Sequence, residues 1–367
     1  MSKNKDSSSG ASGRRFRPLR VIITVIVFLL VIAGIYVAYV FASYKRIPDN
    51  QQLNVVNGET DAIEKETAYK IVSFNMGFGA YEPDYSFFMD GGTESWAWSE
   101  ERLKKNLTAM TKYLKKKKPD ILLLQEVDMN STRTYHVDET ETVSEALPSA
   151  SSVYAVNYDS PFLFYPFGQP HGKSLSGIMT LANFKIESSV RKQLPVETSV
   201  MKIIDLDRCY CKSSLPVEDS DKLLLLYNVH LSAYTSDGTV ADRQLELLAA
   251  DMADEAAAGN YVICGGDFNK DLLGDSSEYF GIKGEQYSWS KPIKTEVFDG
   301  KPLRLVAASN VPSNRVADAP YNPQQFVDVL DGFIVSDNIN VVSNTNLDTG
   351  FAYSDHNPVE MEFELIP

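Results

Sequence analysis

The sequence predicts an α/β protein built as a sandwich of two mainly antiparallel β-sheets with helices on the outside, preceded by one transmembrane helix. Two observations support the sandwich. Segments with the apolar, β-rich composition of strands outnumber segments with helical periodicity. Several of these strands also end in a polar residue, so a candidate functional site is expected along one rim of the sandwich.

Length and composition bound the classes of function. The chain has 367 residues, of which 44% are hydrophobic, enough for one large core or two modest ones. The formal net charge is −14, and the first twenty residues carry +5, so the remainder carries −19. Such an acidic body disfavours tight non-specific binding of nucleic acid. It does not exclude a nuclease in which a metal ion supplies positive charge.

The three cysteines do not form a disulfide framework. Cys209 and Cys211 are too close in sequence for an unstrained bridge, and no histidine lies near them to complete a zinc site. Cys264 is interpreted as a small core residue within a strand. We therefore expect no structural metal or disulfide at these positions.

The amino-terminal region has the pattern of a membrane anchor. Residues 1–20 are Ser-rich and then basic, and residues 21–42 contain no charge. As a helix, these 22 residues would span roughly 33 Å, enough for a bilayer core. The basic flank predicts a cytoplasmic tail over 1–20, a single-pass anchor over 21–43 in the cell membrane and a body outside the cytoplasm. The alternative is a cleaved signal peptide, for which Phe41-Ala-Ser is a weak exit site.

The remainder is predicted to consist of a polar stalk and one domain. Residues 44–67 are rich in Asn, Gln and acids, which favours a linker. No strong linker follows, so residues 68–367 are expected to form a single catalytic domain.

The first elements of this domain are a strand, a loop, a helix and a second strand. A strand over 69–75 ends at Asn75, and a loop over 76–94 rich in Gly, aromatics and acids is either a packed surface loop or a substrate lip. Residues 99–117 carry an apolar stripe at helical spacing that ends before Pro119. Residues 121–127 form a continuous apolar strand, buried on both faces, that ends in a polar residue, and the charge of Glu126 there needs a partner such as a metal.

The later elements follow the same logic. We predict a helix over 240–258, a mostly irregular region over 270–325 and a half-exposed final strand over 359–365. Further extended or strand segments are predicted over 152–165, 177–182, 261–264 and 326–336, and the segments 201–208 and 222–231 could form a hairpin across 212–221.

The stretch Tyr261-Val-Ile-Cys-Gly-Gly-Asp267-Phe-Asn269 is the most informative single motif. An apolar strand stops at two glycines, which permit a tight turn. Asp267 and Asn269 then present a carboxylate and an amide two residues apart, which suits a hard metal ion or a phosphoryl oxygen. Taken alone, the motif fits an ordinary strand-to-turn junction equally well.

Together, the polar residues at the strand ends and in the turns near them form a set with a common chemistry. Carboxylates can hold a divalent cation, amides can orient oxygens, and histidines can carry protons. The chain has neither a P-loop pattern nor a GxSxG elbow. His136 and His171 are interpreted as surface or core residues. The set comprises Asn75, Glu126, His230, Asp267, Asn269, Asp331, Asp355 and His356.

Six motifs resemble those of the endonuclease/exonuclease/phosphatase superfamily, in the order in which that family carries them. They span the chain from Tyr69 to its end. The resemblance implies a four-layer α/β/β/α sandwich and a Mg²⁺ or Mn²⁺ site. The motifs are Ser-Phe-Asn75, Leu-Leu-Gln-Glu126-Val, Asn228-Val-His230-Leu, Gly265-Gly-Asp267-Phe-Asn269, Leu330-Asp331-Gly-Phe-Ile-Val-Ser and Ser354-Asp355-His356-Asn-Pro.

The resemblance also implies roles for the acidic residues and their neighbours. Glu126 would be the principal metal ligand, with Asn75 and Asp355 near it. Asp267 would orient or deprotonate the attacking water. This chemistry needs in-line positioning and charge neutralisation more than a covalent nucleophile.

The remaining roles concern the phosphate. Asn269 and His230 would hold phosphoryl oxygens, and His356, paired with Asp331, would stabilise the transition state or transfer a proton. Arg208 matches loosely a phosphate-contacting arginine of some members, and an exposed salt bridge is an equally good interpretation of it.

Three departures from the family pattern leave the substrate open. The tyrosine expected after Asp331 is absent, and Gly77 stands where some nucleases carry an Asp. The long segment over 166–176 resembles the sphingomyelinase-type branch. We predict a monomeric, membrane-anchored, metal-dependent hydrolase of phosphate esters acting outside the cytoplasmic membrane on a lipid headgroup, an inositol phosphate or nucleic acid. The alternatives are an extracytoplasmic nuclease and a non-catalytic binding protein that keeps the fold.

Overall fold

The computed structural model describes residues 16–58, 61–198, 202, 207–233, 239–282, 287 and 290–367. The chain divides into two compact units, Met1–Lys45 and Arg46–Pro367. The first unit contains α1 (Phe16–Ser43), whose residues Pro18–Ser43 are long and apolar enough to cross a membrane by length and composition. The anchor predicted over 21–43 therefore coincides with a continuous helix.

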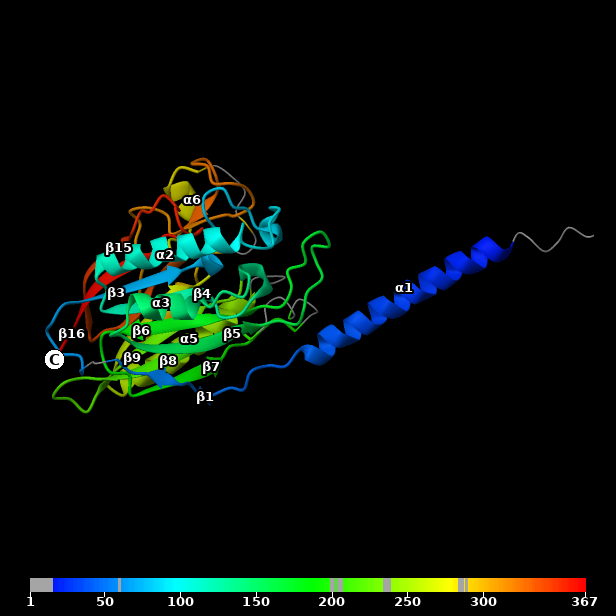
Figure 1. The fold of residues 1–367 in the computed structure, drawn as a ribbon. Coiled ribbons are helices and arrows are strands. Elements are labelled where there is room, and N and C mark those ends of the chain that lie inside the picture. The colour runs from blue at the N-terminus through cyan, green and yellow to red at the C-terminus, as the bar shows by residue number, and fades with distance from the viewer. Residues whose placement is uncertain are drawn as a thin grey trace, which may run out of the picture. The chain divides into compact units, whose positions relative to one another are not determined.

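The second unit is built on two sheets, each with seven strands among the described residues (Figure 1). Each sheet is mixed, with a single parallel pair, β3/β4 in one and β9/β10 in the other. The first sheet has the order β15-β16-β3-β4-β6-β5-β2 and comprises β2 (Val55–Val56), β3 (Tyr69–Asn75), β4 (Ile121–Asp128), β5 (Ser151–Asp159), β6 (Leu175–Ala182), β15 (Ile339–Asn346) and β16 (Val359–Leu365).

The second sheet has the order β1-β7-β8-β9-β10-β14-β11. Its strands are β1 (Gln51–Gln52), β7 (Ser188–Gln193), β8 (Cys209–Pro216), β9 (Leu223–His230), β10 (Tyr261–Asp267), β11 (Leu303–Val306) and β14 (Asp331–Ser336). A short ladder and several short helices lie in the connections: β12 (Asn314–Arg315), β13 (Val327–Asp328), α6 (Ser276–Tyr279) and the 3₁₀ turns η1 (Gly77–Gly79), η2 (Phe88–Asp90), η3 (Thr132–Thr134) and η4 (Thr295–Phe298).

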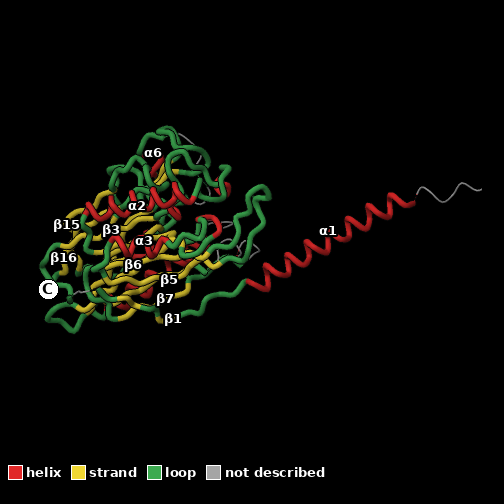
Figure 2. The backbone as a smooth tube through the Cα atoms, in the orientation of Figure 1, coloured by secondary structure: helices red, strands yellow, loops and turns green. Residues whose placement is uncertain are grey.

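Three apolar cores order the layers. One core lies between the sheets and takes buried side chains from both, such as Leu123 of β4 and Ile263 of β10. A second lies under α2 (Glu100–Lys117) and α3 (Glu139–Ala146), on the outer face of the first sheet. The third lies under α5 (Thr239–Ala257), on the outer face of the second sheet. The protein is therefore the α/β/β/α sandwich that the motifs implied (Figure 2).

Most predicted elements occur at or close to their expected positions. β3 has the predicted bounds, and Leu245, Leu248 and Met252 of α5 point into the core as the periodicity required. The final strand β16 alternates buried and half-buried residues. The predicted hairpin is present, but its first strand is β8 at Cys209–Pro216 and not 201–208, of which residues 201 and 203–206 lie outside the described residues.

The segment predicted as a stalk over 44–67 differs from that expectation. β1 pairs with β7, β2 pairs with β5, and Ile63 is fully buried in the core between the sheets. The compact body therefore begins at Arg46 and not at residue 68. The polar composition that suggested a linker belongs to edge strands, whose outward faces are solvated.

Candidate active site

The predicted site residues come together at one rim because of the strand directions. β3 and β4 are parallel, as are β9 and β10, so their carboxyl ends lie at the same edge of each sheet. In the second sheet, Asp267 is in register with His230 on one side and with Asp331 on the other. Asp331 begins its strand because β14 runs antiparallel to β10.

The backbone at two of these positions is adapted to aim the side chain. The pairing of β4 with β6 shifts register between Leu124 and Val127, and Glu126 within this bulge has φ 51°. The bulge turns Glu126 out of a strand whose other residues are buried. Asn269 has φ 46°, and its amide nitrogen donates to the carbonyl of Leu231. Left-handed backbone at non-glycine residues is costly and concentrates at functional sites.

Asn75 links the two sheets at the centre of the site. Its Nδ2 lies 3.1 Å from Oε1 of Glu126 and 3.0 Å from Oδ2 of Asp267, and it donates to both carboxylates. Its Oδ1 accepts a hydrogen bond from the backbone N–H of Gly77 at 2.9 Å. In this orientation, Asn75 positions the two carboxylates, and its oxygen is already engaged.

His356 is held between two aspartates. Its Nδ1 donates to Oδ2 of Asp331 at 2.7 Å, and its Nε2 lies 3.7 Å from Oδ2 of Asp267. Burial opposes a charged imidazole, but the negative charges of Asp331, Asp267 and Asp355 outweigh it and raise the pKa of His356 to about 10. His356 is therefore an imidazolium at neutral pH.

The neighbouring titratable groups respond to the same environment. Burial raises the pKa of Asp267 to about 7, opposed by the charge of His356 and reinforced by Asp331. Burial, Arg208 and His356 lower the pKa of His230 well below its ordinary value, so this ring is neutral. The Nε2 of His230 lies 3.5 Å from Oδ2 of Asp267. The two histidines of the site therefore differ in charge, one cationic and one neutral.

Sequence reasoning missed two polar residues beside the Asp331–His356 pair, of which Ser313 holds the aspartate and Asn314 lies against the ring. The hydroxyl of Ser313 donates to Oδ2 of Asp331 at 2.8 Å and accepts from the backbone N–H groups of Leu330 and Asp331. The Nδ2 of Asn314 lies 3.0 Å from Nε2 of His356. Both residues fall in the stretch predicted as irregular, where no periodicity marks them.

Two groups of side chains at the rim could hold a cation. Ligand atoms of Asp267, Asp331 and His356 all lie within 4.8 Å of one another. The charge of the imidazolium already compensates this trio. Glu126 and Asp355 line the same pocket. Burial and the charge of Glu126 raise the pKa of Asp355 to about 6, although the charge of His356 lowers it. A buried carboxyl group whose pKa is raised by the charge of a neighbouring carboxylate fits a site for a divalent cation.

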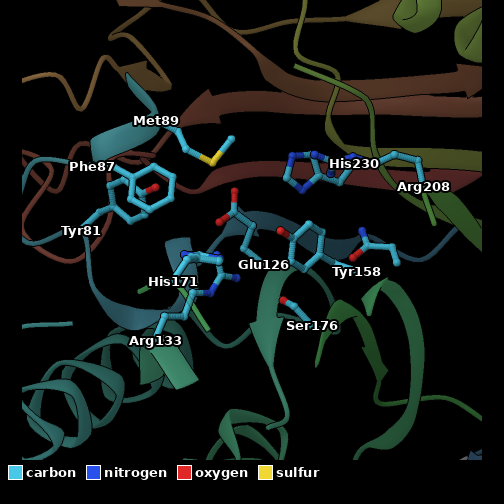
Figure 3. A pocket seen from close by; sticks show the side chains of 11 residues that line it. Tyr81, Phe87, Met89, Glu126, Arg133, Tyr158, His171, Ser176, Arg208 and His230 are labelled. Carbon is cyan, nitrogen blue, oxygen red and sulfur yellow. The ribbon is translucent and has the colours of Figure 1, made fainter. Parts of the chain in front are cut away.

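Two adjoining pockets open at this rim. The first, which we call the site pocket, is lined by Asp267, Asn269, Asn314, Asp355 and His356, among other residues. The second, which we call the side pocket, is lined by Phe87, Met89, Arg133, Tyr158 and His171, among other residues, and Figure 3 shows it. Tyr81, Glu126, Arg208 and His230 line both pockets, so they are two parts of one continuous site.

The loop over 76–94 both packs and lines the site. Phe78 and Tyr85 are fully buried in the core under α2, and the Phe78 and Tyr81 rings pack edge to face 5.1 Å apart. Tyr81 and Phe87 reach the side pocket, where Figure 3 shows them across Glu126 from His230. The loop is therefore packed, and two of its buried residues also line the pocket, while its role as a substrate lip stays a prediction.

Of the two histidines interpreted as surface or core residues, only His171 lines the side pocket. His171 is buried and contacts Phe87 and Phe88, and His136 is exposed. Beside His171, the guanidinium of Arg133 forms two hydrogen bonds with the carboxylate of Asp128, at 2.9 and 2.8 Å. Arg208, matched only loosely from sequence, lines both pockets beside His230.

Directly beneath the site, the two sheets are joined by a buried polar contact. Nε2 of Gln125 donates to Oδ1 of Asn228 at 2.8 Å, and Nδ2 of Asn228 donates to the carbonyls of Leu124 and Met179. Gln125 precedes Glu126, and Asn228 lies two residues before His230. These motif residues therefore fix the relative position of the sheets that carry the site.

Comparisons with known proteins agree on the fold. The model of the "Endonuclease/Exonuclease/phosphatase family" matches residues 72–356. No curated protein matches the sequence. An endonuclease/exonuclease/phosphatase from Beutenbergia cavernae DSM 12333 is similar in structure, with 16% identity, a TM-score of 0.55 and coverage of 82% of this chain and 72% of that one.

Two other solved structures are similar to a comparable extent. The endonuclease/exonuclease/phosphatase from Bacteroides vulgatus has 16% identity and a TM-score of 0.53, with coverage of 82% of this chain and 100% of that one. ANGEL2, described as a 2',3'-cyclic phosphatase in complex with adenosine-2',3'-vanadate, has 15% identity and a TM-score of 0.54, with coverage of 86% and 99%. At these identities the likeness concerns the fold.

Proposed function

The chain belongs to the endonuclease/exonuclease/phosphatase family, and we propose that it is a divalent-metal-dependent hydrolase of phosphate esters. One observation carries the proposal. Six sequence-distant motifs meet at one rim and place an imidazolium, a neutral imidazole and several carboxylates around one site. This combination supplies positive charge for a phosphate and an acceptor for the proton of water.

Asp267 and His356 have different roles in the proposed reaction because of where they lie. Asp267 accepts hydrogen bonds from Asn75 and from the backbone of Asn269, which fixes its carboxylate to orient or deprotonate the attacking water. His356, held by Asp331, faces the same point and stabilises the charge that develops on the phosphoryl oxygens. Positioning and charge stabilisation of this kind account for most of the catalysis in phosphoryl transfer.

We assign the contacts with the substrate to side chains that line the pockets and are not acidic. Asn269 and His230 contact phosphoryl oxygens, the first through its amide and the second as a neutral ring. Arg208 lines both pockets, and its guanidinium binds the phosphate.

The residues present fit a Mg²⁺ or Mn²⁺ ion. Glu126 and Asp355 would hold it, and Asn75 orients Glu126. When bound, the ion neutralises charge on the phosphate and polarises it for attack. The amide oxygen of Asn75 would join the ligands only if the amide turned, since Gly77 now occupies it.

Membrane attachment is part of the proposal. α1 carries the apolar span, and the basic residues before it favour a cytoplasmic amino terminus, with the body outside the membrane. The substrate is then a phosphate ester met outside the cytoplasm, such as a lipid headgroup, an inositol phosphate or nucleic acid. The acidic body counts against nucleic acid as the substrate.

The test uses the full chain in detergent with Mg²⁺ and a panel of sphingomyelin, phosphoinositide, plasmid DNA and RNA. Glu126→Ala and His356→Ala are compared with wild type, and the exposed Glu101→Ala and His136→Ala are the matched controls. We expect one substrate class to be hydrolysed by wild type and controls and not by the site variants. Cleavage of DNA or RNA alone would identify a nuclease. Equal residual rates for all proteins on every substrate would overturn the assigned mechanism.

A further inference from the structure

The side pocket is bordered by a protruding segment that the proposed chemistry does not use. Residues 161–172, which we call the aromatic finger, leave β5 and return to β6. Leu163 and Gly172 close its base with two backbone hydrogen bonds of 3.0 Å. The adjoining loop also holds the finger, through bonds from Ser95 to the carbonyl of Gln169 and from Trp96 to that of Pro170, at 2.6 and 2.7 Å.

The tip of the aromatic finger exposes large aromatic rings to solvent. Phe164, Tyr165 and Phe167 are 50%, 64% and 86% exposed, and all three lie within four residues. Other exposed large apolar side chains of the described body, such as Leu247 and Val342, occur singly along the chain. A cluster of this kind on a surface marks an interaction site.

The charge pattern indicates what the finger contacts. Residues 160–172 contain no Asp, Glu, Lys or Arg, within a body whose net charge is strongly negative. The charges resume at both ends of the finger, where Asp159 and Lys173 lie 3.9 Å apart. Exposed Phe and Tyr rings without charge favour the interfacial region of a lipid bilayer, where an aromatic ring can be buried while its polar edge stays wet.

The body places the finger on the side where the chain leaves toward α1. The backbone N–H of Ile47 donates to Asp207 at 2.8 Å, and only Tyr44 and Lys45 lie between the end of α1 and the start of the body. The buried Arg191 bonds the carbonyls of Asp207 and Ile47 and, through Nε at 2.8 Å, the carbonyl of Val156 on β5. β5 leads directly into the finger.

We propose that the aromatic finger inserts its tip into the interfacial region of the bilayer that holds α1, next to the entrance of the side pocket. Phe88 connects the two, since its ring lies 5.8 Å from Tyr165 of the finger and it stands between Phe87 and Met89, which line the pocket. Insertion presents the site to phosphate esters at the membrane surface. This inference rests on the proposed membrane attachment and is independent of the proposed hydrolysis.

The test measures the depth of single labelled positions. The three native cysteines are fully buried, so an introduced surface cysteine is the one accessible thiol among the described residues. Phe167→Cys is labelled with an environment-sensitive fluorophore in the full chain and reconstituted into phosphatidylcholine vesicles that contain a nitroxide lipid. Gln52→Cys, on β1 just after the link to α1, and Asp221→Cys, in the turn between β8 and β9, are the controls.

We expect about twofold quenching at position 167, as for a group about 5–10 Å inside the interface, and much less at positions 52 and 221. The difference should persist at high salt, because no ion pairs with lipid are involved. Adding Phe164→Ser and Tyr165→Ser should abolish it. Equal quenching at all three positions in floated vesicles would overturn the proposed insertion of the finger. The exposed rings would then be a contact surface for another protein. A chain that fails to float with vesicles would overturn both anchor and finger.

Discussion

Nδ1 of His356 lies 2.7 Å from Oδ2 of Asp331, and the charge of this aspartate favours the protonated form of the ring. Ser313 holds the same aspartate oxygen in place at 2.8 Å. The other aspartate oxygen, Oδ1, is buried and has no hydrogen-bond partner among the described residues. The negative charge of Asp331 therefore acts mainly on the imidazolium of His356, so the effect of removing that charge can be predicted.

Replacing Asp331 with Asn should remove the charge that keeps His356 protonated. The pKa of His356 should then fall from about 10, because burial lowers it and one of the opposing charges is gone. We expect kcat/KM to fall by about a hundredfold. NMR titration of the His356 ring measures the pKa directly. Asp348→Asn, an exposed residue, is the control, and an unchanged pKa of His356 in Asp331→Asn would contradict the assignment.

Metal affinity should depend on Glu126 and Asp355 more than on Asp331. Glu126→Gln and Asp355→Asn each remove one carboxylate from the pair that lines the site pocket. We expect each to weaken binding of Mn²⁺ by about tenfold or more, since carboxylate charge dominates affinity for hard cations. Mn²⁺ binding followed by electron paramagnetic resonance measures this without an activity assay. A loss in Asp331→Asn that equalled these two would place the ion in the histidine-centred trio instead.

Gly77 should be intolerant of even the smallest side chain. Its φ is +53°, and an added Cβ would lie 2.7 Å from the ring of Tyr81 and 3.1 Å from Oδ1 of Asp355. Gly77→Ala should destabilise the protein by about 1–3 kcal/mol and lower activity by displacing both neighbours. Gly350→Ala is the matched control, because φ there is +59° and nothing lies within 4 Å of the added Cβ. Chemical denaturation and initial rates should separate the two variants.

Stability should fall in mild acid because of His171. Burial, reinforced by Arg133, lowers the pKa of this ring to about 3 from an ordinary value of 6.5. The unfolded chain therefore takes up a proton below pH 6.5 that the folded chain refuses, so stability present above pH 6.5 is lost as the pH falls. The loss is about 1.4 kcal/mol per pH unit. His171→Gln should flatten the slope of unfolding free energy between pH 6.5 and 5, and His136→Gln should not.

The strand ends were predictable from sequence because each couples a buried strand to a polar terminus. The bounds of β3 and the presence of Glu126, Asp267 and His356 at one rim follow from composition, order and the resemblance. The bulge at Glu126 did not follow, since periodicity marks a strand without showing where its register shifts.

The residues missed by the sequence analysis share a physical reason. Ser313 precedes and Asn314 begins the two-residue strand β12, in a stretch without periodicity, and short polar side chains there cannot be told from those of a loop. The stalk prediction over 44–67 failed in the structure because the edge strands β1 and β2 take stability from pairing with the body and not from their own composition. The side pocket draws on several separate segments, so no single motif announces it.

The buried contact between Gln125 and Asn228 has a consequence for the effect of heating on activity. Asn75 and Glu126 lie on one sheet, while His230, Asp267 and Asp331 lie on the other. Neither sheet holds the complete set of groups that we propose for the reaction, so activity requires that the two sheets stay packed together. Thermal loosening of that packing would separate the groups before either sheet melts. Heating should therefore silence the enzyme reversibly at temperatures where its circular dichroism is still that of the native protein.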